Sequence, residues 1–96
     1  MKKSSSYEKE LLKQLKNRDE AIAYLNAALE EDNREAFLLA LSHVIQAQSS
    51  FSSIAKKTKL NREGLSKLLT GSENPKINGL FSLLGALGLK IQVAQD

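Results

Sequence analysis

The chain of 96 residues lacks cysteine and tryptophan, has a single proline, and contains only 5% aromatic residues. Without cysteine, disulfides and thiolate metal sites are excluded, and the chain suits a reducing compartment, so we expect it in the cytoplasm. Aromatic and β-branched residues, which favour strands, are sparse, whereas Ala, Leu, Lys and Glu are abundant. The composition therefore favours helices.

Long apolar stretches are also missing. The stretch at 36–41 is among the longest, and it is far shorter than the roughly 18 residues that a membrane-spanning helix needs. The first six residues include two lysines but precede no apolar stretch, so they are not typical of a signal peptide. With 42% apolar and 26% charged residues, the chain has the composition and length of one globular domain.

Charge is unevenly distributed along the chain, although the net value is only +3. Residues 1–16 carry five Lys against two Glu, residues 17–48 carry two Arg against six acidic residues, and residues 49–96 carry seven basic against three acidic residues. A basic half beside an acidic segment suggests two surfaces with two kinds of partner. A chance scatter of solvated charges is the alternative, and the distribution alone leaves both open.

Helical spacing of apolar residues predicts helices over about 7–16, 20–31, 33–48, 51–58, 62–70 and 77–88. We divide the chain into an N-terminal arm with a short helix (1–18), a five-helix domain (19–88) and a C-terminal segment (89–96). Asp19 and Asp32 are expected to cap the helices that follow them, with Glu35 reaching back to the Asp32 amide. The helix ending near Gln48 is apolar on several sides, which predicts a central position.

The strict alternation of apolar and polar residues at 89–93 predicts one short strand. A lone strand leaves its backbone groups unpaired, and no second strand is predicted, so we expect it to pair with its copy in a homodimer. An extended tail packed on the last helix is the other interpretation.

Two short helices joined by three residues form the most informative pattern. In a helix-turn-helix unit, the first helix needs a small residue where the second crosses it, and Ala55 meets that need. Ile54, Leu60, Leu65 and Leu68 are expected to hold the pair on the domain. This arrangement leaves the polar face of 61–70 free to enter the major groove of DNA.

Polar residues of this unit supply the candidate DNA contacts. Arg62 can donate two hydrogen bonds to guanine, and Glu63 can accept one from cytosine. Lys67 can reach a base or a phosphate, and the remaining candidates offer hydroxyls, amides or positive charge to phosphates. The DNA-binding set is Ser50, Ser52, Lys56, Lys59, Asn61, Arg62, Glu63, Ser66 and Lys67.

Other chemistry finds little support in the sequence. His43 is the single histidine and has no partner at metal-ligand spacing, so we expect it to lie on the surface or to pack between helices. No phosphate-binding loop or nucleophile motif occurs, so we expect no enzyme activity, no cofactor and no metal. Lys59 stands at a turn position that requires a positive φ and is usually glycine.

The sequence resembles the HigA-like antidote proteins of toxin–antitoxin addiction modules, a branch of the phage-repressor-like (XRE) helix-turn-helix superfamily. The resemblance covers about 19–93 and is carried by the segments 24–30, 36–41, 54–55, 61–63, 74–75 and 86–89. Lys59, Gly64 and Ser66 depart from the family pattern.

The resemblance implies an all-α, phage-repressor-like fold. It also implies an antitoxin that binds operator DNA as a homodimer, represses its own operon and neutralises a RelE/ParE-like toxin. Two alternatives share most of this chemistry: a stand-alone transcriptional regulator, and a toxin-binding module without DNA activity.

Overall fold

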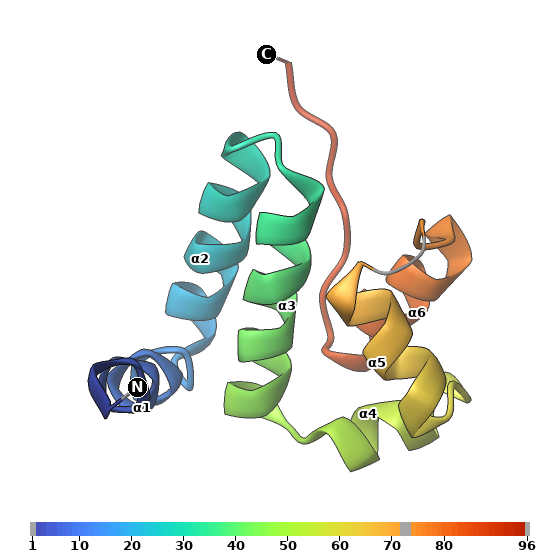
Figure 1. The fold of residues 1–96 in the computed structure, drawn as a ribbon. Coiled ribbons are helices and arrows are strands. Elements are labelled where there is room, and N and C mark those ends of the chain that lie inside the picture. Colours follow the sequence, from blue (N-terminus) through green and yellow to red (C-terminus); the bar gives the residue numbers. More distant parts are fainter. Residues whose placement is uncertain (1, 72–73, 96) are drawn as a thin grey trace.

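Six α-helices make up the regular structure in the computed structural model, which describes residues 2–71 and 74–95 (Figure 1). The helices are α1 (Lys2–Gln14), α2 (Arg18–Glu30), α3 (Arg34–Gln48), α4 (Phe51–Thr58), α5 (Arg62–Thr70) and α6 (Ile77–Ala86). The predicted all-α class is confirmed. Within the described residues, no helix is long and apolar enough to cross a membrane.

The first helix contributes to the core, and the predicted count of five helices in the fold is wrong, because the described residues form six. The first helix begins at Lys2, ahead of the expected start, and crosses one end of the α2–α3 hairpin (Figure 1). Leu11 and Leu15 are buried against the other helices, with 9% and 1% of their surface exposed. The Gln48 side chain at the end of α3 also donates to the carbonyl of Leu15 (2.7 Å).

Helix capping is provided by asparagine where aspartate was expected. Asn17 Oδ1 accepts from the amide of Glu20 (3.0 Å), and Asn33 Oδ1 accepts from the amide of Ala36 (3.1 Å). Asp19 lies inside the first turn of α2, and Asp32 has a left-handed backbone (φ 54°), so neither has the extended geometry of a cap. The predicted capping box at Asp32 is therefore wrong.

The predicted central position of the third helix is confirmed. α3 contacts α1, α2, α4 and α5, and Leu41 and Ile45 on it are fully buried. His43 also lies on this helix and is 9% exposed, so the expectation that α3 presents it to solvent is wrong and the expectation of helix packing holds. An apolar helix surface this wide stabilises the fold because neighbours cover it on several sides.

The C-terminal strand is not formed: residues 89–95 are extended but belong to no strand. The first residue, Leu89, packs against the core and donates its amide to the Leu84 carbonyl (2.7 Å). The rest runs beside α3 (Figure 1), with Ile91 and Val93 exposed. Alternation was a correct signal of extended backbone, but the monomer supplies no partner strand.

Candidate nucleic-acid interface and a neighbouring groove

The turn between α4 and α5 is held by the last residue of α4. The Thr58 hydroxyl donates to the Ile54 carbonyl (2.8 Å) and accepts from the Leu60 amide (3.3 Å). Lys59 adopts the predicted left-handed conformation, with φ 64° and ψ 10°. The turn therefore has one defined geometry, at the cost of about 1–2 kcal/mol for a side chain in the left-handed region.

The buried side of the helix pair matches the prediction closely. Ile54, Ala55 and Leu65 are buried at the contact between α4 and α5, and Leu60 is half-buried. Leu68 is also half-buried, and the buried position one residue later belongs to Leu69, which the sequence reasoning missed. Both leucines face the domain, so the polar face of α5 points away from it.

The start of α5 is fixed by a short hydrogen bond, in which Asn61 Oδ1 accepts from the Gly64 amide at 2.6 Å. A Cβ at position 64 would lie 3.2 Å from that same oxygen. Glycine here, although a poor helix former, thus makes room for a close cap. The cap occupies the Asn61 carbonyl oxygen, while its amide nitrogen still has two donors to offer a phosphate or base.

All nine predicted DNA-binding residues are exposed. Asn61, Arg62, Glu63, Ser66 and Lys67 lie on α5 or at its cap, and Lys56 and Lys59 adjoin its start. Glu63 Oε2 and Lys67 Nζ form a loose ion pair (3.9 Å).

Ser50 caps α4, accepting from the Ser53 amide (3.1 Å), and Ser52 lies in the same first turn. These serines therefore lie at the end of α4 that is farther from the turn into α5.

Polar contacts between distant parts of the chain support the domain, and sequence reasoning predicted none of them. Arg34 Nη1 donates to Asn74 Oδ1 (2.5 Å), joining the start of α3 to the segment after α5. At the other end of the domain, Arg18 Nη2 donates to the carbonyls of Leu87 (2.6 Å) and Gly88 (2.9 Å). The partners are 40 to 70 residues apart in the chain, beyond the reach of any local pattern.

A second polar cluster lies under α1. The Tyr24 hydroxyl is 2.9 Å from His43 Nδ1, and His43 Nε2 is 3.8 Å from Glu8 Oε2. Burial raises the pKa of Tyr24 above its ordinary value of 10.0, and the electrostatic effect of Tyr7 adds to the rise. The described residues contain no group of three or more potential metal ligands.

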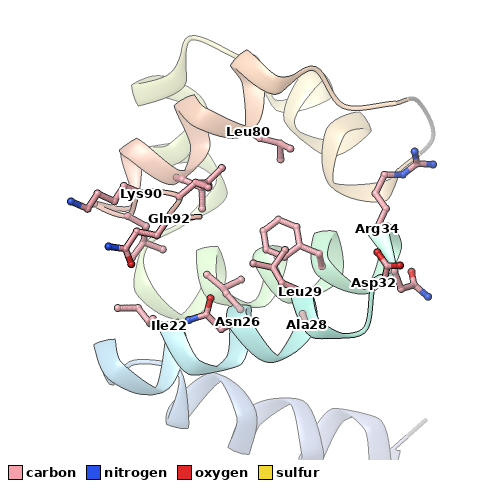
Figure 2. A pocket seen from close by; sticks show the side chains of 16 residues that line it. Ile22, Asn26, Ala28, Leu29, Asp32, Arg34, Leu80, Lys90 and Gln92 are labelled. Atoms are coloured by element: carbon pink, nitrogen blue, oxygen red, sulfur yellow. The ribbon is translucent and has the colours of Figure 1, made fainter. Parts of the chain in front are cut away.

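A groove of about 760 Å³ lies between α2 and the pair formed by α6 and the C-terminal tail. Figure 2 shows Ile22, Asn26 and Leu29 on one wall, Leu80 on the opposite wall, and Lys90 near one end. The α2 apolar residues follow the predicted helical spacing. Yet Leu29 is 58% exposed, so this face of α2 is only partly covered by the domain.

The model of a family described as probable addiction module antidote protein matches residues 6–95. The chain belongs to this antidote family. A relative from Haemophilus influenzae strain Rd, described only as an uncharacterized protein, is 39% identical over 82 residues, which is 85% of this chain and 84% of the relative. No solved structure matches the chain.

Membership of the antidote family gives the chain a toxin as partner, because an antidote acts by counteracting the toxin of its module. The match extends over both α5 and the groove, from the middle of α1 into the C-terminal tail.

Proposed function

We propose that this antidote is a sequence-specific DNA-binding protein that represses its own operon and neutralises a RelE/ParE-like toxin. In this proposal α4 and α5 form a helix-turn-helix unit of the phage-repressor-like type. α5 enters the major groove of operator DNA. The observation that carries the proposal is the full exposure of the polar face of α5 on a helix whose other face is locked into the core.

Charge on the α4–α5 surface supports a DNA partner. Between residues 50 and 71, five side chains are basic (Lys56, Lys57, Lys59, Arg62 and Lys67) and one is acidic (Glu63). All six are exposed, so they can approach the phosphate backbone without unfolding any part of the domain. Displacement of counterions by such a group makes DNA binding steeply dependent on salt.

Base readout is assigned to Arg62 and Glu63, because the first residues of a recognition helix lie deepest in the groove. The ion pair between Glu63 and Lys67 is exposed and long, so it contributes little energy and can yield to contacts with DNA. Lys67 follows Glu63 by one turn of α5, and in this proposal it contacts a phosphate or a neighbouring base.

The protein acts as a homodimer in this account, since repressors of this type bind two half-sites about one helical turn apart. α6 supports the proposal: Ile77–Ala86 contains no charged residue, and Ile77 and Phe81 are 62% and 53% exposed. A second copy presents the same uncharged face. Sedimentation of Phe81→Glu beside the wild type tests it, with a shift from dimer to monomer expected. Repression of its own operon would place the protein on the nucleoid, in the cytoplasm.

Two measurements test the proposed function. Fluorescence anisotropy compares binding to the DNA upstream of the protein's own reading frame with binding to a scrambled duplex of equal length, over a range of salt. A tighter complex with the upstream DNA, weakened steeply by salt, is expected. No preference at any salt would leave the antidote without an operator role. Rescue of growth, with the product of the adjoining reading frame as toxin, tests neutralisation separately.

A further inference from the structure

We propose that the groove between α2 and α6 is where this antidote holds its toxin, and that the occupant is a basic, amphipathic segment of the toxin. The inference rests on the neutralising part of the proposed function and adds the site and the chemistry of the partner. It is independent of DNA binding, because α5 does not line the groove.

Apolar residues that the fold leaves open give the groove its capacity for a partner. Leu29 is 58% exposed, Ile91 is 52% exposed and Ile22 is 38% exposed, and all three line the groove. Its volume of about 760 Å³ lies within the roughly 300–1,000 Å³ usual for binding clefts. Covering these side chains removes apolar surface from water, which favours association.

The solvent side of the α2 wall is acidic. At 100° per residue, Asp19 and Glu30 lie beside the row formed by Ile22, Asn26 and Leu29, one toward each end of the helix. Ala23 and Ala27, on the same exposed side of α2, are small and let a partner approach closely. Asp32 lines the groove at its far end (Figure 2).

Among the side chains of residues 6–71 and 74–95, none of the carboxylates Asp19, Glu30 and Asp32 takes part in an ion pair. The single basic residue of α2, Arg18, directs its guanidinium to the carbonyls of Leu87 and Gly88. Two basic residues line the groove: Arg34, which donates to Asn74, and Lys90, which lies at the end opposite Asp32 (Figure 2). The acidic rim therefore remains available to lysine or arginine from a partner.

The end of α2 is electrostatically unfavourable in the monomer. Glu30 and Glu31 lie where the helix dipole is negative, and the last turn contains no basic residue. Acidic side chains at this end destabilise a helix, whereas cations stabilise it. A cationic partner segment would relieve that repulsion, so the gain in energy is specific to a basic occupant.

The same charges disfavour other occupants. A symmetric dimer through the groove would bring the two acidic α2 rims into one interface, since such an interface uses the same patch twice. DNA would be repelled by the rim. A basic protein segment meets neither obstacle.

The decisive variant is Leu29→Glu, with Leu39→Glu as its matched control. Both leucines are on helices and equally open, at 58% and 57% exposed, but Leu39 does not line the groove. Affinity for the purified product of the adjoining reading frame is measured by calorimetry on the full chain. We expect Leu29→Glu to weaken binding by about 30-fold or more, the level of a binding hot spot, and Leu39→Glu to bind as the wild type does.

A milder variant examines the charge. Glu30→Gln should slow association at low salt and leave it unchanged at high salt. Glu10→Gln, at an exposed position of α1, should leave association unchanged at both. Thermal unfolding of every variant is recorded, so that loss of fold is separated from loss of contact.

The outcomes separate the possible failures. Equal affinity of Leu29→Glu and wild type overturns the groove proposal and leaves the antidote function intact. A wild type that neither binds nor neutralises the adjoining product overturns the proposed pairing itself. If Leu29→Glu keeps toxin affinity but turns a dimer into a monomer by sedimentation, the groove holds a second copy and the proposal is wrong.

Discussion

Arg18 Nη2 lies 2.6 Å from the carbonyl oxygen of Leu87, so the first residue of α2 holds the residue that ends α6, 69 positions later in the chain. The same nitrogen binds the Gly88 carbonyl, where the chain turns into the tail with φ 77°. The Arg18 side chain thus joins α2 to the end of α6 and the start of the tail, which form opposite walls of the groove.

The Arg18 contact predicts a stability loss for Arg18→Lys and a larger one for Gly88→Ala. Lysine has a single nitrogen and cannot keep both the carbonyl bonds made by Nη2 and the bond from Nη1 to Gln48 Oε1 (3.4 Å), so the loss should cost about 1 kcal/mol. A Cβ at position 88 would lie 2.6 Å from Arg18 Nη2 on a left-handed backbone, so Gly88→Ala should cost about 2 kcal/mol or more. Urea unfolding measures both, and equal stability of all three proteins would contradict the contact.

Lys59 predicts opposite changes in stability and in DNA affinity. Glycine at φ 64° removes a left-handed cost of about 1–2 kcal/mol but makes the unfolded chain more flexible by about 0.5–1 kcal/mol, so Lys59→Gly should stabilise the fold by about 0.5 kcal/mol. The same change removes a phosphate contact and should reduce the salt slope of DNA binding by about 1. Denaturation and anisotropy give the two values, and a destabilised variant would contradict the backbone argument.

The caps offer a test between neighbouring residues. Asn33→Ala should destabilise the protein by about 1 kcal/mol because it removes the acceptor for the Ala36 amide. Asp32→Gly should be neutral or stabilising, since Asp32 has φ 54° and caps nothing. Thermal unfolding compares them, and the reverse order would restore Asp32 as the cap.

Sequence patterns located α4 and α5 to the residue because strong local signals bound them: Ser50 caps one helix, Asn61 caps the other, and Gly71 ends it with φ 73°. The same reasoning chose the wrong caps for α2 and α3, since asparagine and aspartate cap equally well and stand one or two positions apart. The alternation of apolar and polar residues at 89–93 predicted an extended backbone. Whether such a backbone forms a strand depends on a neighbouring strand to pair with, and the local pattern does not show one.

The groove escaped prediction for a related reason. Ile22 and Leu29 follow the same spacing as the buried Leu25 and Ala28, and nothing local tells a covered apolar residue from an open one. Which part of the α2 face is covered depends on where α6 and the tail lie. That position is set by Arg18, through contacts about 70 residues apart.

The raised pKa of Tyr24 predicts that the folded protein loses stability at alkaline pH. Its pKa is raised in the folded protein, so the unfolded chain releases the phenolic proton first as pH rises. The contribution to stability is therefore complete below about pH 10 and is lost as the pH passes the raised folded value. Urea unfolding from about pH 8 to pH 11 should show this decline in the wild type and less of it in Tyr24→Phe. Equal declines would assign the effect to other groups.

The central claim is that α5 reads DNA, and sequence selection from a randomised duplex library tests it most directly. The chain supplies its own control, because α1 carries another adjacent basic–acidic pair, Lys9–Glu10, with both side chains exposed as they are in Arg62–Glu63 of α5. We predict that Arg62→Ala/Glu63→Ala loses base preference while Lys9→Ala/Glu10→Ala keeps it, with both variants folded. An unchanged preference in the α5 variant would contradict the account.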